Sequence, residues 1–282
     1  MKDFGFIPID DKGLARVSLA QKICFVISII TLNQNSLFPT EFSVLGTANV
    51  MKGGFFKLDD YLGRKVTTTE KVVFNLLLYV PFFVQHLVMA RMWFKEAMQR
   101  RWRNYVFYER LLFNLVSSIL CFFMFQLYQA DDRVLFEIDF PYARVIWYVF
   151  YALGLGLLGW SVIDMGENDL FCFGLLRDWK KNKGSKFPAF VDVETQSILR
   201  ASCRHPLYAS LFVINTFGPT AYTATRFGHI ITMEIFTYIG AVMEQKGLKK
   251  LPGYTDYMKA TPNQFIPDIR AWFRRPKEAK KD

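Results

Sequence analysis

The sequence predicts an all-α membrane protein, a bundle of five or six transmembrane helices, and three observations favour this fold class. Of its 282 residues, 52% are hydrophobic and 17% are aromatic, which is a more apolar composition than that of a typical soluble domain. Several apolar segments come close to the roughly 20 residues that a helix needs to cross the hydrocarbon core. The connections between these segments alternate in charge, as consecutive crossings require.

Residues 1–70 are predicted to form an N-terminal arm that precedes the main membrane domain. Within the arm, residues 18–32 are apolar except for polar side chains such as Gln21 and Lys22. The uninterrupted part is too short to cross a bilayer by itself. This stretch is therefore either a first span that starts in the interface or a helix that lies along it.

Five further stretches are predicted to cross the membrane, because each is a long apolar run with few charged residues. They are residues 72–94, 111–129, 142–163, 206–222 and 227–243. Pro81 lies in the middle of the first stretch and is expected to kink it. The third stretch is rich in glycine, which permits close helix packing.

The charges of the connections predict the orientation of these spans. Residues 91–110, residues 177–204 and the tail from residue 245 are basic, whereas residues 130–141 are acidic. By the positive-inside tendency, the basic segments share the cytosolic or matrix-like side. The net charge of +10 is then a property of membrane loops, and we expect membrane lipids rather than nucleic acid as partners. Residues 71–268 are assigned to the membrane domain and residues 269–282 to a basic tail.

The four cysteines give no sign of a disulfide framework or a metal site. They are scattered along the chain and form no Cys-x-x-Cys pair. We therefore predict no structural metal.

Three ionisable side chains from distant stretches are predicted to gather on the basic side of the membrane. His205 starts the fourth strong span, Glu244 ends the fifth, and His86 lies about 10 Å short of the basic end of the first. Polar groups at membrane depth are costly and often functional. The alternative is structural, because Pro206 is a good helix start and Arg204 can reach lipid phosphates. Glu234, in the middle of a span, is expected to pair inside the bundle.

A series of motifs around His205 follows the order of a known family. The segment Arg204-His205-Pro206-Leu207-Tyr208 precedes a predicted helical hairpin, a carboxylate, two spaced tyrosines and an Ile-Pro pair. This order resembles the membrane methyltransferase superfamily that includes isoprenylcysteine carboxyl methyltransferase and phospholipid methyltransferases. The residues that match after the hairpin are Glu244-Gln245, Leu248, Gly253-Tyr254, Tyr257, Pro262 and Ile266-Pro267.

Upstream motifs narrow the resemblance to the branch of NnrU, nurim and methanethiol methyltransferase. These motifs are Gln85-His86-Leu87-Val88-Met89-Ala90-Arg91, Glu109-Arg110, Gly159-Trp160 and Asp169-Leu170-Phe171. The likeness covers roughly residues 72–267. It implies a membrane bundle that ends in a helical hairpin and a tail.

The resemblance also implies a cofactor and a set of site residues. In this family the His-Pro segment, the hairpin and the tail enclose S-adenosylmethionine. Methyl transfer from a sulfonium needs orientation, exclusion of water and a negative or π-rich surrounding. An active enzyme is expected to methylate a small thiol or a lipid-soluble acceptor. The residues carried over are His205 and Glu244 as catalytic, and Arg204, Tyr208, Tyr254 and Tyr257 as cofactor-binding.

Three departures from the family pattern favour a different function, and one of them is a tail that is shorter between Glu244 and Tyr254 than in the family's enzymes. Ser210 replaces the glycine after His-Pro-x-Tyr-x, and Gln245 replaces the second glutamate. Together with the long N-terminal arm, they suggest a degenerate methyltransferase that serves as an accessory subunit of an organellar membrane complex. This interpretation is preferred here, with the active enzyme as its near-equal alternative. Under it, the chain needs no cofactor and has other membrane-protein subunits as partners.

A haem-binding function is the least favoured alternative. Zeta-carotene isomerase, which is NnrU-like, binds haem b through histidines in the corresponding spans and has a cysteine near its His-Pro pair. His86, His205 and Cys203 stand in the matching places of this chain. Ligation by two imidazoles from two helices is chemically feasible.

An integral membrane location follows from the predicted spans. The mitochondrial inner membrane is the leading expectation for the organelle, and the endoplasmic reticulum or the nuclear envelope is the alternative.

Overall fold

The structure is a computed structural model that describes residues 22–24, 26–27, 56–102, 105–164, 198–218 and 220–270. These residues are mostly helical, which confirms the predicted fold class. They fall into two compact units. Unit 1 is formed by Met1–Arg133, Gly166–Phe187 and Ala224–Arg226, and unit 2 by Val134–Met165, Pro188–Thr223 and Phe227–Asp282.

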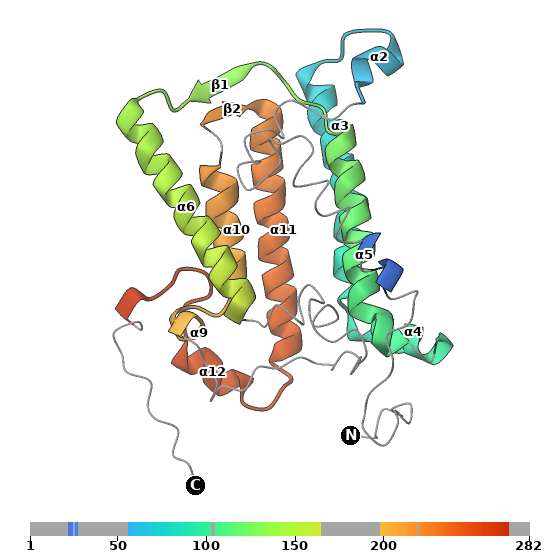
Figure 1. The fold of residues 1–282 in the computed structure, drawn as a ribbon, viewed down its shortest axis with the longest axis vertical. Helices are drawn as coiled ribbons and strands as arrows, with labels where there is room; N and C mark the ends of the chain where they lie inside the picture. The colour runs from blue at the N-terminus through green and yellow to red at the C-terminus, as the bar shows by residue number, and fades with distance from the viewer. Residues whose placement is uncertain are drawn as a thin grey trace. The chain divides into compact units, whose positions relative to one another are not determined.

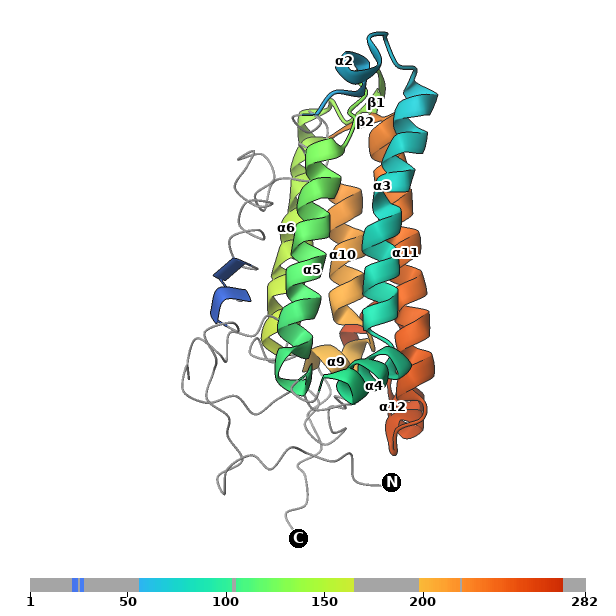
Figure 2. The ribbon, with the colours of Figure 1, turned by 90° about the vertical axis from the view of Figure 1, so that its right-hand side faces the viewer.

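Unit 1 is built around two long helices. Its elements are α2 (Leu58–Leu62), α3 (Thr68–Met89), α4 (Met92–Arg101) and α5 (Tyr105–Leu127). The helices α3 and α5 pack against each other, and Figure 2 shows α2 at one end of this pair and α4 at the other.

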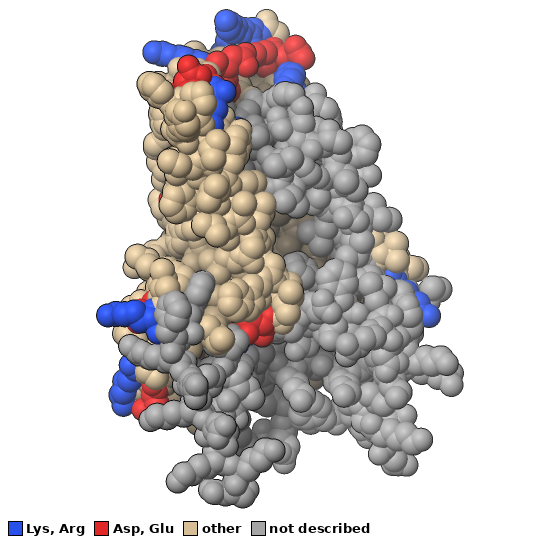
Figure 3. Space-filling model, turned by 60° about the vertical axis from the view of Figure 1, so that its left-hand side comes forward, with Lys and Arg blue, Asp and Glu red and all other residues tan. Residues whose placement is uncertain are grey.

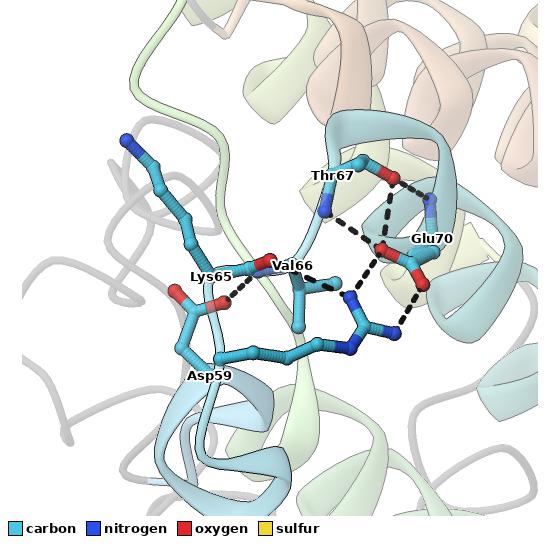
Figure 4. A network of polar contacts seen from close by, with 6 residues as sticks. Asp59, Lys65, Val66, Thr67 and Glu70 are labelled. Atoms are coloured by element: carbon cyan, nitrogen blue, oxygen red, sulfur yellow. Dashed lines mark hydrogen bonds and ion pairs between the residues drawn. The ribbon is translucent and has the colours of Figure 1, made fainter.

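The start of α3 is fixed by a capping box. Thr67 Oγ1 accepts a hydrogen bond from the Glu70 backbone N–H (3.3 Å), and Glu70 Oε2 accepts one from the Thr67 N–H (2.8 Å; Figure 4). Arg64 also binds the Glu70 carboxylate at 2.6 Å. These contacts satisfy backbone donors of the first turn that have no partner within the helix.

Two polar side chains inside α3, Asn75 and Gln85, are paired with groups at or near α5. Asn75 and the backbone of Gln129 exchange two hydrogen bonds of 2.8 Å. Gln85 donates to the Phe113 carbonyl (3.4 Å) and accepts from Ser117 Oγ (3.0 Å). Because these groups are satisfied within the protein, α3 can lie at membrane depth despite its polar residues.

The first predicted span is interrupted close to its end. Residues 72–94 were expected to be one helix, but α3 ends at Met89 and α4 begins at Met92. Arg91 has an extended backbone (φ −80°, ψ 139°) and serves as the N-cap of α4, which separates the two helices. The helix α3 continues through Pro81. A buried ion pair joins α4 to α5, with Lys95 Nζ 2.8 Å from Glu109 Oε1.

Unit 2 contains the helices that carry most of the predicted site. Its elements are β1 (Val134–Glu137), α6 (Pro141–Asp164), α9 (Ile198–Ser202), α10 (Pro206–Phe217), β2 (Ala221–Thr223), α11 (Ala224–Leu248) from Phe227 onward, and α12 (Tyr254–Ala260). Figure 1 shows α6, α10 and α11 running between the two strands at one end and α9 and α12 at the other.

The two strands were not predicted. They pair antiparallel, with Val134 opposite Thr223 and Phe136 opposite Tyr222. The rings of Phe136 and Tyr222 stack at 4.3 Å between centroids. From the sequence, residues 130–141 were expected to form an acidic loop and residues up to 222 the end of a span. Each strand is too short for an alternating pattern to be visible in the sequence.

Close packing and one polar pair hold the long helices of unit 2 together. Gly154 on α6 meets α10 so closely that an added Cβ would lie 2.9 Å from Val213 Cγ1 and 3.0 Å from Ile214 Cγ1. Thr216 Oγ1 on α10 donates to Glu234 Oε1 on α11 at 2.7 Å. The predicted pairing of Glu234 inside the bundle is therefore confirmed.

Three described helical segments are long and apolar enough to cross a membrane. They are Thr68–Met89, Tyr108–Leu127 and Pro141–Asp164. The predicted span 206–222 is shorter than expected, because α10 ends at Phe217 and β2 follows. The predicted span 227–243 lies inside the longer helix α11. The total of five or six crossings stays a prediction.

The apolar length of α6 matches a bilayer. Arg144 binds Glu137 at one end of this helix (3.1 Å), and Asp164 binds Arg200 at the other (2.8 Å). The uncharged residues 145–163 between these pairs rise about 28 Å, close to the thickness of about 30 Å of the hydrocarbon core. Figure 3 shows the corresponding uncharged band, with charged side chains gathered at its ends.

Some predictions fall on residues outside the described part. These are most of the N-terminal arm, the Asp169-Leu170-Phe171 motif, most of the basic connection 177–204 and the tail beyond residue 270. Of the apolar stretch 18–32, residues 22–24 and 26–27 are described and are helical. Whether that stretch crosses the membrane, and where the domain boundaries lie, stay predictions.

Candidate functional site

The candidate site lies in unit 2, where α9 turns into α10. Cys203 and Arg204 connect the two helices, and His205 is the N-cap of α10. Pro206 occupies the first helical position, where its missing N–H removes no hydrogen bond. The imidazole of His205 makes no capping hydrogen bond, so its ring is available for other contacts.

The tail after α12 is tied to this turn by backbone hydrogen bonds. They run from Arg204 N–H to the Asn263 carbonyl (3.0 Å), from His205 N–H to the Gln264 carbonyl (2.9 Å) and from Asp268 N–H to the Ser202 carbonyl (2.9 Å). As a result, two segments about 60 residues apart form one local structure.

Side chains strengthen the same connection. Arg204 Nη1 donates to the carbonyls of Thr261 and Pro262, each at 2.9 Å. The Tyr257 hydroxyl of α12 donates to the Arg200 carbonyl of α9 at 3.0 Å. Arg204 and Tyr257, two of the predicted cofactor-binding residues, therefore also hold the tail against the turn.

Of the three side chains predicted to gather, His205 and Glu244 lie next to each other in unit 2, whereas His86 belongs to unit 1. The His205 Nδ1 atom is 3.8 Å from Glu244 Oε2, which is longer than a hydrogen bond. Burial and the positive charge of Arg204 lower the pKa of His205 to about 4. The imidazole is therefore neutral at pH 7, and its contact with Glu244 is not an ion pair in this state.

Two aromatic rings lie beside the His205 side chain. The ring of Tyr208 lies 5.4 Å from it and that of Phe265 lies 5.9 Å from it, measured between centroids. Phe265 also contacts Phe212 (5.3 Å) and Tyr238 (6.1 Å). Tyr208 interacts with the Glu244 carboxylate as well. The Glu244 carboxylate and the aromatic rings of Tyr208 and Phe265 thus lie close to His205 in unit 2.

The two tail tyrosines lie beside this group. The rings of Tyr254 and Tyr257 on α12 meet edge to face at 5.6 Å. Burial raises the pKa of Tyr254, and the negative charge of Glu244 raises it further. The carboxylate that faces His205 therefore also acts on Tyr254. The structure brings all six predicted site residues together within unit 2, while their roles stay predictions.

Three buried nitrogen atoms at the junction have no hydrogen-bond partner among the described residues. They are Arg204 Nε, His205 Nε2 and Gln264 Nε2. Buried polar atoms are nearly always satisfied, so such a group indicates a missing ligand or water. Gln264 was not predicted as a site residue from the sequence. It stands within the tail motif between Pro262 and Ile266, but nothing in its spacing shows that it pairs with His205.

Comparison with known proteins gives the site a context. No family model and no solved structure matches the chain. Among curated proteins, methanethiol S-methyltransferase 1 of Bradyrhizobium diazoefficiens is 27% identical over 73% of this chain and 70% of its own length. Methanethiol S-methyltransferases of Pseudomonas deceptionensis (28% identical; 70% and 72% covered) and Mycobacterium tuberculosis (26% identical; 67% and 76% covered) are also similar.

The chain is homologous to methanethiol S-methyltransferases. The resemblance predicted from the sequence is thereby confirmed for that part of the branch and for the membrane superfamily to which those enzymes belong. The likeness to NnrU and nurim stays a prediction. With its apolar helices, this methyltransferase homologue is an integral membrane protein.

Two of the three departures from the family motif have local explanations in this methyltransferase homologue. Ser210 is fully buried, and its hydroxyl donates to the Leu207 carbonyl of its own helix at 2.6 Å. Gln245 directs its amide to Met258 Sδ of α12 at 3.5 Å. Neither side chain leaves an unsatisfied polar atom at the site.

The residues of the haem alternative are distributed over both units. His86 lies in unit 1 against Phe82 and Phe113, whereas His205 and Cys203 belong to unit 2. Burial raises the pKa of the Cys203 thiol to about 11, so the thiol is protonated at neutral pH. Among the described residues, no three His, Cys, Asp or Glu side chains cluster as a metal site.

Proposed function

We propose that this integral membrane protein is an S-adenosylmethionine-dependent methyltransferase whose acceptor is a small thiol. The observation that carries the proposal is the set of unpartnered buried nitrogens of Arg204, His205 and Gln264 next to Glu244. The printed names of the bacterial relatives support the choice of reaction and acceptor.

The residues of the site fit the proposed cofactor. S-adenosylmethionine supplies a methyl group on a positively charged sulfonium. The negative charge of Glu244 and the π faces of Tyr208 and Phe265 suit such a cation. Arg204 suits a carboxylate, and the buried Tyr254 and Tyr257 lie close enough to interact with it.

A thiol that is methylated on sulfur must lose its proton. At neutral pH His205 is uncharged and therefore able to accept it. Glu244, 3.8 Å from Nδ1, would stabilise the imidazolium that results, and more strongly if the gap closed when the site is filled. We assign proton transfer to His205 and electrostatic support to Glu244.

The test is a binding and turnover experiment on the purified full-length protein in detergent. Calorimetry measures S-adenosylmethionine binding, and headspace analysis measures dimethyl sulfide formed from methanethiol. We expect the wild type to bind S-adenosylmethionine saturably and to turn over methanethiol, and we expect turnover to be lost in His205→Ala. His229→Ala is the matched control. It removes a different buried imidazole, which lies on α11 about 22 Å from Glu244 along that helix. A wild-type protein that binds no S-adenosylmethionine would contradict the proposal.

An absorbance scan of the same sample tests the haem alternative. A Soret band that disappears in His86→Ala and in His205→Ala would favour haem b over the methyltransferase. The role of an accessory subunit has no specific observation in its favour and is not proposed. Membrane lipids are the partners that we propose, against exposed apolar side chains of α6 such as Val145 and Leu153. The mitochondrial inner membrane stays a prediction from the sequence.

A further inference from the structure

Two of the three unpartnered nitrogens at the junction of α10 and the tail, Arg204 Nε and the side-chain nitrogen of Gln264, are hydrogen-bond donors. The Nε of Arg204 is a permanent hydrogen-bond donor, and the side-chain amide nitrogen of Gln264 is a donor with two protons. Both are buried without a partner in the described structure. They are also held together, because Arg204 and His205 donate backbone hydrogen bonds to Asn263 and Gln264. A ligand for this place must therefore be an acceptor.

The orientation of Arg204 restricts the ligand further. Its Nη1 atom is occupied by the carbonyls of Thr261 and Pro262, and no described residue bonds Nε or Nη2. These last two atoms form the edge of the guanidinium that meets a carboxylate with two parallel hydrogen bonds. A planar anion with two oxygens fits this edge better than a single hydroxyl or carbonyl does.

The negative charge of Glu244 indicates that the ligand also carries a positively charged group. Glu244 lies 3.8 Å from His205, the residue that follows Arg204. It suits a cationic group, whereas the edge of Arg204 and the amide of Gln264 suit an anionic one. A molecule with a carboxylate and a nearby positive charge, which is the arrangement of an α-amino acid, matches this distribution.

We propose that Gln264, together with the Nε–Nη2 edge of Arg204, binds the carboxylate of the methionine portion of S-adenosylmethionine. The inference rests on the proposed function and adds to it a binding residue and the orientation of the cofactor. Gln264 is a binding residue in this assignment and takes no part in the proton transfer. Its amide oxygen stays free to accept a hydrogen bond from the neighbouring ammonium.

The experiment compares two ligands on two variants of the full-length protein. Calorimetry in detergent measures the dissociation constants of S-adenosylmethionine and of decarboxylated S-adenosylmethionine, which lacks only the carboxylate. In Gln264→Leu we expect S-adenosylmethionine to bind about tenfold more weakly, as for the loss of a hydrogen bond to a charged group. The affinity for the decarboxylated analogue should be unchanged.

Gln264→Glu serves as an isosteric second variant in case the leucine disturbs folding. It places a negative charge against the carboxylate, so the loss of S-adenosylmethionine affinity should exceed that of Gln264→Leu. Asn263→Ala is the control, since it removes a neighbouring side chain and keeps the backbone carbonyl that accepts from the Arg204 N–H. If the variants weaken both ligands equally, or neither, the assignment of Gln264 is wrong while the proposed function stands. If the wild type binds neither ligand, the proposed function itself fails.

Discussion

The Nδ1 atom of His205 lies 3.8 Å from Oε2 of Glu244, although the two residues stand on different helices and 39 positions apart. The two side chains differ in their surroundings. His205 is buried, whereas 47% of the Glu244 side chain is exposed. A neutral imidazole thus meets a solvated carboxylate across a gap that is wider than a hydrogen bond. This difference allows the two groups to be tested separately.

Glu244→Gln should reduce methyl transfer without unfolding the protein. We expect the turnover number to fall by about 10²-fold, because the charge that stabilises the protonated His205 is lost. Since the side chain is half exposed, the free energy of unfolding should change by no more than about 0.5 kcal/mol. Turnover and thermal unfolding in detergent measure the two effects. Glu96→Gln on α4 is the charge-matched control, and equal losses in both variants would contradict the assigned role.

His205 should make the stability of the protein depend on pH. Its pKa is lowered from 6.5 to about 4 in the folded protein, so between these values the unfolded chain binds a proton that the folded chain does not. The free energy of unfolding is therefore highest above pH 6.5. It falls as the pH is lowered towards 4, by up to about 3 kcal/mol. Thermal unfolding between pH 4 and pH 8 measures the change. A similar pH dependence in His205→Asn would show that another group is responsible.

Two glycines of α6 should respond in opposite ways to the same substitution. In Gly154→Ala the new Cβ would lie 2.9 Å from Val213 Cγ1, and we expect a destabilisation of about 1–3 kcal/mol through overpacking against α10. In Gly156→Ala nothing lies within 4 Å of the new atom. The gain in helix propensity should make this variant neutral or slightly more stable. Unfolding in detergent compares them, and equal effects would mean that α6 and α10 do not pack as described.

The ion pair between Lys95 and Glu109 should show strong coupling. Only 13% and 2% of their side chains are exposed, so removing one partner leaves a buried charge without compensation. We expect Lys95→Met or Glu109→Leu alone to cost about 3–5 kcal/mol and the double variant to cost much less than the sum. A double-mutant cycle of unfolding free energies measures the coupling, and additive single effects would disprove it.

The sequence predicted best where a local property decides the structure. The helix α6 (Pro141–Asp164) was predicted within one residue at each end, because a long apolar run with few charged residues defines it. The boundary between α3 and α4 was missed, because a single extended residue, Arg91, separates two apolar stretches. The strand pair was missed because its partners lie 84 or more positions apart in the chain.

For the candidate site, the motif residues were found because their order follows a known family. His205 and Glu244 were expected on the same side of the membrane from topology alone, and the structure places them in contact. Gln264 was not found, since its position beside Arg204 and His205 depends on backbone hydrogen bonds between distant segments. Such pairing leaves no periodic signal in the sequence.

The link between the turn at His205 and the tail at Gln264 also has a consequence for biogenesis. During translation at about 5–20 residues per second, the tail is synthesised roughly 3–12 s after the turn to which it binds. In that interval α11 is made, and the donors around Arg204 have no tail carbonyls to hold them. The residues of the candidate site can thus come together only after the helices that support them have been made.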